Sequence, residues 1–314
     1  MSKTNQPGGA TPHAELLSHQ DSSFDHHDAL MESARDRIRQ SGDLPAASIE
    51  QQLAILEELA TFELGRFLLQ HNGLNAYWTH HLVTYRDDGS AANFSGQLEA
   101  LIHQQLPSVL ATRERFGIFR QQLQQLLRPG IVMASVPCGF MGDLMLLDYS
   151  HHQDVSLIGV DLDQQALEGA RQLAVQRGLE KQLSLYCHDA WSLNLGTHVD
   201  VLTSNGLNIY QPDDERVTAL YCAFFDGLKP GGTLVTSFLT PPPALSADSP
   251  WREADPTLLA FQQLLFSRIL NAKWTSFRTH AQTKFQLRKA GFSDIEFIND
   301  RMHMFPTVVA RKPR

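Results

Sequence analysis

The chain has 314 residues and a mass of 35.2 kDa, which allows one large domain or two smaller ones. Hydrophobic residues make up 42% and charged residues 19%, and no apolar run reaches the roughly 18 residues of a membrane span. The net charge of −8 and the lack of a Lys/Arg cluster are untypical of nucleic-acid-binding proteins, so we expect neither a nucleic-acid nor a membrane partner. The three cysteines, Cys138, Cys187 and Cys222, form no CxxC pair, and the N-terminus lacks the apolar segment of a secretory signal. These features predict a cytoplasmic protein without a disulfide framework.

The N-terminal third is predicted to be helical after a short arm. Residues 1–24 are rich in Gly, Pro, Ser, Gln and His, which predicts a flexible arm. Between residues 25 and 128 the periodic segments have helical spacing. Ser48 begins a capping-box pattern, a period of about 3.6 residues follows it, and Asn72 is typical of a helix end. Another helix is predicted from about residue 108.

From residue 131 onward, short β-rich runs alternate with helical ones. This alternation favours a parallel α/β sheet with right-handed crossovers. Prolines at 241–243 interrupt it, so we expect residues 129–314 to form one α/β core with a helical insertion at about 244–277. Strands are predicted at 131–136, 155–160, 183–187, 199–204, 233–239, 295–298 and 307–310, and helices at 142–149, 163–177, 212–228, 256–271 and 279–290.

Polar residues follow the first three strands of this core. Gly139 lies in the first βα turn, where the backbone must turn sharply and approach a ligand closely. Asp161 ends the second strand, where a carboxylate can accept both hydroxyls of a ribose. Asp189 and Trp191 follow the third strand, where an acid can accept from an adenine amino group and an apolar neighbour can cover the ring. Ligands bind at the carboxyl ends of strands in such sheets, so these features predict a nucleotide site.

The order of these features resembles that of the class I S-adenosylmethionine-dependent methyltransferases. The shared pattern is a loop after the first strand, acids after the second and third, Leu-Lys-Pro-Gly-Gly before the fifth, and a terminal antiparallel pair; it covers roughly residues 128–240 and 275–314. The resemblance implies a Rossmann-like, mostly parallel sheet of seven strands with a terminal antiparallel strand. It also implies S-adenosyl-L-methionine as cofactor and methyl transfer to an acceptor, which we expect to be a small molecule.

The resemblance assigns residues to parts of the cofactor. The loop 135–139 would contact the methionine moiety, Asp161 the ribose, and Asp189 with its neighbours the adenine. The acceptor would enter beside the end of the fourth strand, where Asn208 is a candidate contact. The expected cofactor-binding residues are Ser135, Val136, Pro137, Cys138, Gly139, Asp161, Leu162, Asp189, Ala190, Trp191 and Asn205.

The first loop departs from the family pattern, which reads acid-x-Gly-x-Gly-x-Gly. Ser135 replaces the acid, Pro137 the first glycine and Met141 the third, and Gly142 is displaced by one position. A serine accepts a ligand ammonium less strongly than a carboxylate, and a proline has no N–H to donate.

The helical region 25–128 is expected to be a cap over the open end of the sheet and not an independent domain. Its segment 66–85 has aromatic and polar side chains that can shape the acceptor pocket, and we expect Arg66, Tyr77 and Trp78 to contact the acceptor. The same aromatic residues are also typical of packing between the helices and the sheet. The sequence assigns no catalytic base.

Simpler interpretations of the site residues stay open. Gly139 is typical of any tight turn, and Asp161 of a helix N-cap or a surface carboxylate. Asp189 is also typical of a loop, and Asn205 and Asn208 of turns. The adjacent His pairs do not have metal-ligand spacing, so we expect no metal. For the whole chain the alternatives are a catalytically inactive interaction protein that keeps the cofactor fold, and an NAD(P)-binding dehydrogenase, which needs a complete G-x-G-x-x-G.

Overall fold

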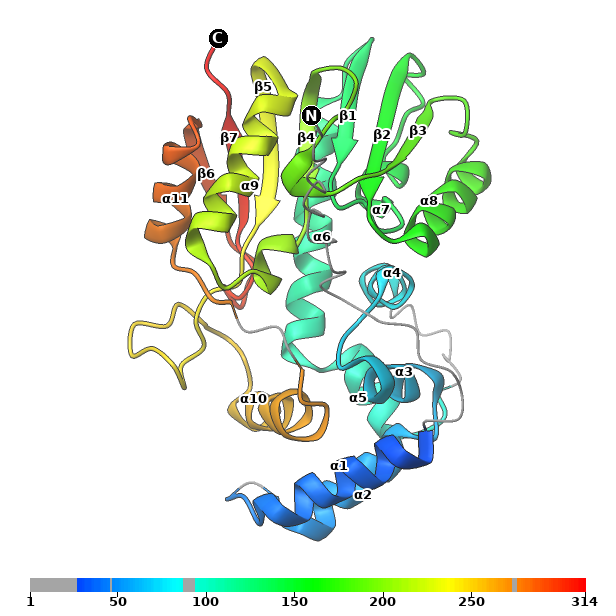
Figure 1. Ribbon diagram of the computed structural model, residues 1–314, viewed down its shortest axis with the longest axis vertical. Helices are drawn as coiled ribbons and strands as arrows, with labels where there is room; N and C mark the ends of the chain where they lie inside the picture. Colours follow the sequence, from blue (N-terminus) through cyan, green and yellow to red (C-terminus); the bar gives the residue numbers. More distant parts are fainter. Residues whose placement is uncertain (1–26, 46, 87–93, 273–275) are drawn as a thin grey trace, which may run out of the picture.

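The computed structural model describes residues 27–45, 47–86, 94–272 and 276–314, so the predicted arm at 1–24 lies outside the described residues. The C-terminal part holds a sheet of seven strands, with helices on both faces (Figure 1). The strands are β1 (Ile131–Ser135), β2 (Val155–Asp161), β3 (Leu183–Cys187), β4 (Val199–Ser204), β5 (Leu228–Ser237), β6 (Ser293–Ile298) and β7 (Thr307–Arg311).

The strand order is β3-β2-β1-β4-β5-β7-β6. Strand β7 is antiparallel to both of its neighbours, and the other pairs are parallel. From β1 the chain runs outward to β2 and β3, and it then returns to place β4 on the other side of β1. This change in strand order between β1 and β4 creates the crevice at which ligands bind in open α/β sheets. The Rossmann-like fold with a terminal antiparallel strand is therefore confirmed.

Two apolar layers cover the sheet. One face packs against α9 (Asp214–Gly227) and α11 (His280–Lys289), with Tyr221 and Phe224 fully buried between them and the strands. The other face packs against α7 (Gly142–Met145), α8 (Gln164–Arg177) and the second half of α6 (Pro107–Leu126). The central strands are buried on both faces, as parallel sheets require.

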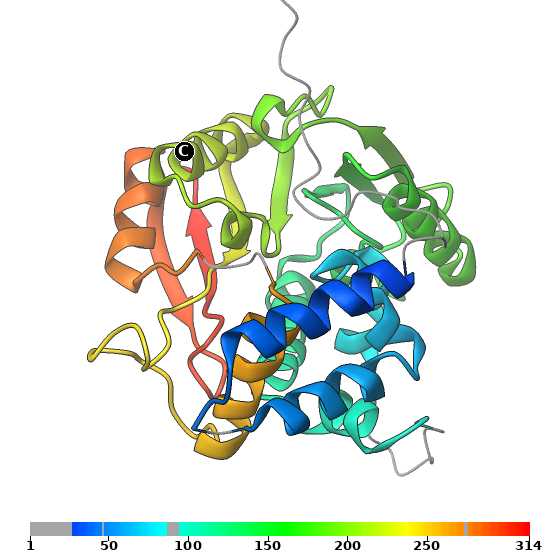
Figure 2. The ribbon, with the colours of Figure 1, turned by 60° about the horizontal axis from the view of Figure 1, so that its bottom comes forward.

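The remaining helices form a second layer below the carboxyl ends of the strands (Figure 1). Segments far apart in the sequence share its apolar core, because Leu264, Leu265 and Ile269 from the predicted insertion pack among the N-terminal helices. Figure 2 shows α10 beside α1 in this layer. Its elements are α1 (His27–Ser41), α2 (Ile49–Leu59), α3 (Glu63–His71), α4 (Ala76–Thr84), α5 (Gln97–Gln104), the first half of α6, α10 (Pro256–Gln263) and the π-helix η4 (Leu264–Ile269).

Helix α6 joins the two layers. Its residue Val109 belongs to the apolar core of the helical layer, whereas Phe119 and Leu123 are fully buried against the sheet. Between these ends Ala111 packs with residues of the β6–β7 connection, among them Phe305. The helical layer and the sheet therefore share one continuous element.

Several predicted boundaries differ from the structure. The helix expected to run on from Ser48 to Asn72 is two helices, because the extended backbone at Phe62 turns the chain and buries that ring. Residues 229–232, expected to lie before the fifth strand, fall inside β5, where the pairing with β4 shifts register. The helix expected at 142–149 covers only residues 142–145. The capping box at Ser48 and the left-handed helix end at Asn72 are confirmed. Within the described residues, no helix is long and apolar enough to cross a membrane.

Candidate active site

A cavity of about 750 Å³ lies where the carboxyl ends of β1 to β4 meet the helical layer. The loops after these four strands form one wall, and α4 and α6 form the opposite wall. Of the expected cofactor-binding residues, all but Val136 line this cavity; Val136 is fully buried in the sheet core. The cavity therefore brings together residues that are up to 70 positions apart, from Ser135 to Asn205.

The loop after β1 is tied to the end of β2. Gly139 has a positive φ of +51°, which glycine adopts without strain, and its N–H donates to Asp161 Oδ2 at 2.9 Å. The N–H of Cys138 donates to the carbonyl of Val160 at 2.9 Å. Burial, with the charges of nearby aspartates, raises the pKa of the Cys138 thiol well above its usual value, so this thiol stays protonated.

Asp161 lies between two backbone amides. Its Oδ1 accepts from the N–H of Asp163 at 3.0 Å, and Asp163 in turn caps α8. Burial raises the pKa of Asp161, and the two amides oppose that shift. Each carboxylate oxygen keeps a second lone pair, so the group can still accept two hydroxyls from a ligand in the cavity.

The loop after β3 forms a second acidic end of the cavity. Asp189 is the N-cap of the short helix η2 (Ala190–Ser192), and its carboxylate accepts from the N–H of Trp191 at 3.0 Å. The Trp191 indole donates to the carbonyl of Arg216 at 2.8 Å, and the Arg216 guanidinium lies 5.4 Å from the ring centroid. The indole ring is therefore fixed beside Asp189.

A buried acid that no sequence pattern indicated lies next to Ser135. Asp143 is 7% exposed and lines the cavity, and its two carboxylate oxygens lie 3.3 and 3.2 Å from Ser135 Oγ. Burial raises the pKa of Asp143, and hydrogen bonds from Ser135 and from the N–H of Leu144 oppose that shift. The carboxylate forms no ion pair with a described cation. The turn at Met141 and Gly142 places this acid beside the position where the family carries one.

Helix α4 contributes a histidine to the cavity wall. A Cβ atom added to Gly142 would lie 2.8 Å from His80 Nδ1, so the imidazole packs directly on this loop. Burial, with a smaller effect from His81, lowers the pKa of His80, which keeps the ring neutral near pH 7. A neutral imidazole at this place can accept a proton.

The end of β4 supplies two further polar groups. Asn205 Oδ1 accepts from the hydroxyl of Ser237, the last residue of β5, at 3.2 Å. This hydrogen bond orients the Asn205 amide. Tyr210, from the 3₁₀-helix η3 (Leu207–Tyr210), also lines the cavity, and burial raises the pKa of its phenol.

The residues expected to contact the acceptor do not line this cavity. Arg66 donates to the carbonyl of Ala60 within the helical layer, and Trp78 packs against that layer's core. Tyr77 is 49% exposed. Asn208 is buried and donates to the hydroxyl of Tyr221 at 2.8 Å. Their placement does not support the acceptor contacts we expected, and Arg66, Trp78 and Asn208 make structural contacts instead.

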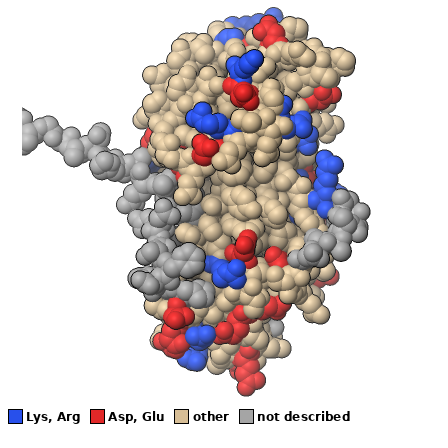
Figure 3. Space-filling model, turned by 90° about the vertical axis from the view of Figure 1, so that its right-hand side faces the viewer, with Lys and Arg blue, Asp and Glu red and all other residues tan. Residues whose placement is uncertain are grey.

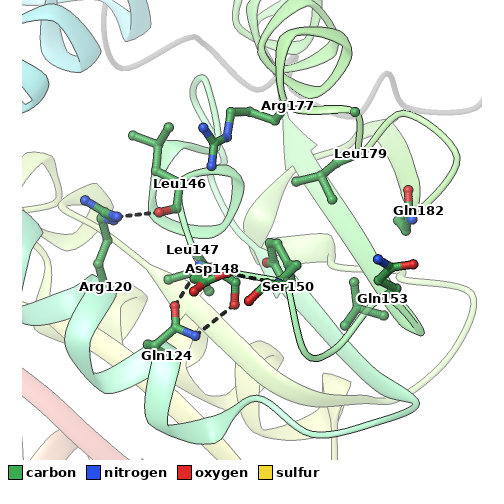
Figure 4. Close-up of a pocket in the computed structure, with 13 residues that line it drawn as sticks. Arg120, Gln124, Leu146, Leu147, Asp148, Ser150, Gln153, Arg177, Leu179 and Gln182 are labelled. Carbon is green, nitrogen blue, oxygen red and sulfur yellow. Dashed lines mark hydrogen bonds between the residues drawn. The ribbon is translucent and has the colours of Figure 1, made fainter.

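A second cavity of about 650 Å³ lies beside the C-terminal end of α7 (Figure 4). Its two arginines donate to backbone carbonyls of that end, Arg120 to Leu146 and Arg177 to Met145. Gln124 exchanges two hydrogen bonds with the backbone of Asp148. These groups close a helix end, and the cavity holds none of the acids described above. Among the described residues, no group of three His, Cys, Asp or Glu side chains has a metal-binding arrangement.

Comparison with known proteins agrees with the fold. A family model described as a methyltransferase domain matches residues 136–232, which span the loops after β1 to β4. A crystal structure of a possible exported protein from Bordetella parapertussis is 51% identical, covers 94% of this chain and 98% of its own, and superimposes with a TM-score of 0.89. The S-adenosylmethionine-dependent methyltransferase SibL shares the fold, at 16% identity over 92% of this chain and 77% of its own, with a TM-score of 0.52. No protein of curated function matches the chain.

Residues 136–232 therefore match a methyltransferase domain, and the chain has the fold of an S-adenosylmethionine-dependent methyltransferase. About half of its residues are identical to those of the Bordetella parapertussis protein over nearly the whole length of both chains.

Proposed function

We propose that this protein transfers a methyl group from S-adenosyl-L-methionine to a small-molecule acceptor. When bound, the cofactor supplies a methyl group on a positively charged sulfur, an electrophile that needs no further activation. Transfer breaks the S–CH₃ bond, forms a bond between that carbon and an acceptor atom, and leaves the demethylated sulfur nucleotide; a proton on the acceptor atom goes to a base. The protein must therefore chiefly align the two reactants and exclude water.

The observation that carries this proposal is the buried carboxylate of Asp143 in contact with Ser135. A buried anion that has no cationic partner among the described residues costs free energy, and a ligand ammonium in the cavity would compensate it. We propose that Asp143 accepts the ammonium of the methionine moiety in place of the acid that Ser135 replaces. With Asp143 in this role, the altered loop is compatible with cofactor binding and does not favour the inactive alternative.

The other cofactor contacts stay as the sequence analysis assigns them, without Val136. We propose that Asp161 accepts the ribose hydroxyls, and that Asp189 with Ala190 and Trp191 holds the adenine. Their placement along one wall of one cavity supports this assignment. The helical layer covers that wall, and we propose that it acts as the cap.

We further propose that His80 is the base for an acceptor that must lose a proton. It lines the same cavity, it makes no hydrogen bond through its ring within the described residues, and its lowered pKa keeps it neutral. The lining also contains Tyr210, whose raised pKa keeps its hydroxyl protonated and able to donate to the acceptor.

The acceptor is proposed to be a small molecule because the cavity is bounded on both sides. On the face in Figure 3, Lys and Arg are interspersed with Asp and Glu, a distribution that does not favour a polyanionic partner. We also propose a cytoplasmic location, which the absence of a disulfide among Cys138, Cys187 and Cys222 supports. Recovery of the native protein from a periplasmic fraction would contradict that location.

Binding calorimetry tests the function directly. We expect S-adenosylmethionine or its demethylated product to bind with a dissociation constant of about 10 μM or below, and NAD to bind at least about 100-fold more weakly. A flat titration with both sulfur nucleotides on folded protein would contradict the proposal, and tighter binding of NAD would favour the dehydrogenase alternative.

A further inference from the structure

One cation in the cavity wall has no role in the cofactor contacts above. Arg115, on α6, is 6% exposed and lines the cavity. Its Nη1 donates to Ser237 Oγ at 3.4 Å, a long bond to a neutral oxygen. Its Nε is buried and has no hydrogen-bond partner, and its guanidinium carbon lies 4.8 Å from the centroid of the Phe305 ring. The guanidinium is therefore buried with most of its donors unused.

Asp300, the carboxylate whose charge affects the pKa of Arg115, is hydrogen-bonded to backbone N–H groups. Asp300 is fully buried in the β6–β7 connection, and its oxygens accept from the N–H groups of Met302, Met304 and Phe305. Asp300 forms no ion pair with Arg115 among the described salt bridges. Burial lowers the pKa of Arg115 to about 10, and Asp300 only partly opposes this shift, so the group still carries its charge near pH 7.

The position of Arg115 places it at the acceptor end of the cavity. Its partner Ser237 ends β5 and also bonds Asn205 after β4, the place where the family resemblance puts the acceptor. Asp143 contacts Ser135 at the end of β1, whereas Arg115 contacts Ser237 at the end of β5, and β4 lies between these two strands. We therefore assign Asp143 and Arg115 to different ends of the cavity.

The surroundings of Arg115 indicate the rest of the ligand. Ser108 and Thr112 line the cavity at helical spacing from Arg115, and Val109 and Phe116 line it from the adjacent stripe of α6. An arginine fork binds a carboxylate through two parallel hydrogen bonds. The described lining residues include two arginines and no lysine. Arg216 lies over Trp191 at the adenine end, so Arg115 is the one cation that can bind a singly charged group at the other end. Ile209 and Phe305 pack together with Ala111 of α6 near Arg115, and the cavity lining also contains Val109, Phe116 and Phe266.

We propose that Arg115 binds the carboxylate of the methyl acceptor, and that the acceptor is therefore an aromatic or otherwise apolar carboxylic acid. This inference rests on the proposed function and names its substrate class. Arg115 holds the acid by its carboxylate, and the apolar wall holds the remainder of the molecule toward Asn205. A neutral analogue of the same shape would leave the guanidinium buried and unpaired, so the site discriminates by charge.

The test uses the full-length protein saturated with S-adenosylhomocysteine, whose binding is measured first by calorimetry. The probes are 4-fluorophenylacetate and its neutral amide, 4-fluorophenylacetamide, and ¹⁹F NMR titration gives their affinities. We expect the acid to bind at least about tenfold more tightly than the amide. In Arg115→Met this preference should fall to within about twofold, and in Arg115→Lys part of it should remain, because a lysine keeps the charge without the fork.

Arg113→Met is the matched control. Arg113 lies two residues earlier on α6, does not line the cavity, and donates to the carbonyls of Leu82 and His103. The acid preference should survive in this variant. Binding of S-adenosylhomocysteine should change by less than about threefold in Arg115→Met, which also shows that the variant is folded.

The outcomes separate the two proposals. If S-adenosylhomocysteine does not bind the unchanged protein, the proposed function and this inference both fail. If it binds but the acid shows no preference over the amide, or Arg115→Met retains that preference, only this inference fails. A loss of S-adenosylhomocysteine affinity in Arg115→Met with an unchanged acid preference would assign Arg115 to the carboxylate of the cofactor instead, and tighter binding of 4-fluorophenyl phosphate would overturn the assignment to a carboxylate.

Discussion

Asp161 is the residue on which cofactor affinity should depend most. Its carboxylate keeps lone pairs for two ribose hydroxyls while accepting from the N–H groups of Gly139 and Asp163. Hydrogen bonds to a charged acceptor contribute about 1.5–3 kcal/mol each, so Asp161→Ala should weaken S-adenosylmethionine binding at least about tenfold in calorimetry. The control is Asp255→Ala, which removes an N-cap carboxylate that accepts two backbone N–H groups outside the cavity. Equal affinity in Asp161→Ala and in the parent protein would place the ribose elsewhere.

Asp143 should show opposite effects on binding and on stability. Its folded-state pKa is raised by burial, so the folded protein holds this proton more tightly than the unfolded chain does. The contribution of Asp143 to the free energy of unfolding therefore falls as pH rises from its usual pKa of 3.8 through the raised value. Asp143→Asn should remove this part of the pH dependence and raise the unfolding temperature near pH 7.

The same variant should bind the cofactor less well. An amide cannot pair with the ammonium as a carboxylate does, so we expect Asp143→Asn to weaken S-adenosylmethionine binding about tenfold at pH 7. In the parent protein, affinity should increase with pH through the raised pKa, because only the charged carboxylate attracts the ammonium. Unfolding curves and calorimetry between about pH 4 and pH 8 measure both effects. A variant that is less stable and binds equally well would show that Asp143 is only a structural residue.

At the scale of elements, two helical glycines form a matched pair. Gly169 on α8 faces the loop after β1, and an added Cβ would lie 2.1 to 2.5 Å from three atoms of the Phe140 ring, which lines the cavity. Gly117 on α6 is exposed, and an added Cβ would meet nothing within 4 Å. Gly117→Ala should therefore stabilise the protein by about 0.5–1 kcal/mol, whereas Gly169→Ala should destabilise it by about 1–3 kcal/mol.

The two glycine variants should also differ in binding. Displacement of Phe140 moves the loop that contains Gly139, so Gly169→Ala should weaken S-adenosylmethionine binding, and Gly117→Ala should not. Denaturant unfolding gives the two free energies, and calorimetry gives the two affinities. A stabilising Gly169→Ala would mean that the loop after β1 adapts to α8 without cost.

At the scale of the whole molecule, the helical layer and the sheet should unfold together. Helix α6 has residues in both apolar cores, and the insertion after β5 packs among the N-terminal helices. Leu56→Ala empties a fully buried position of the helical layer and should cost about 2–5 kcal/mol. We expect scanning calorimetry to show one transition, shifted to lower temperature, for the whole protein. Leu245→Ala, at a position that is 68% exposed, should leave the transition unchanged.

A second transition in Leu56→Ala, with the sheet melting at its original temperature, would show that residues 25–128 form a domain of their own. The predicted boundary near residue 128 would then also be an energetic boundary.

Much of the core follows from local patterns in the sequence. The strands from residue 131 to 204 are short β-rich runs between helical segments, and the strand boundaries differ from prediction by no more than one residue up to β4. Because parallel strands end at the same edge of a sheet, the positions of Gly139, Asp161 and Asp189 along the chain already predicted that they would meet. The start of β5 could not be predicted in this way, because its Pro-Gly-Gly run has the composition of a turn and Gly231 has a φ of +80°. The pairing of Leu228 with Val199 before the run, and of Thr233 with Val201 after it, is what extends β5 back to residue 228.

What the sequence by itself determined is therefore the order of strands and helices and the acids that follow β2 and β3. The tertiary structure alone decided which other side chains join them. Asp143 contacts Ser135, eight residues earlier, only because a short turn brings the chain back. Val109 and Phe116 are seven residues apart on α6, and this spacing is the same whether the helix face covers an apolar core or a cavity. No sequence pattern indicates Arg115. Its assignment depends on a buried Nε that has no hydrogen-bond partner, and this is known only when the positions of the surrounding side chains are known.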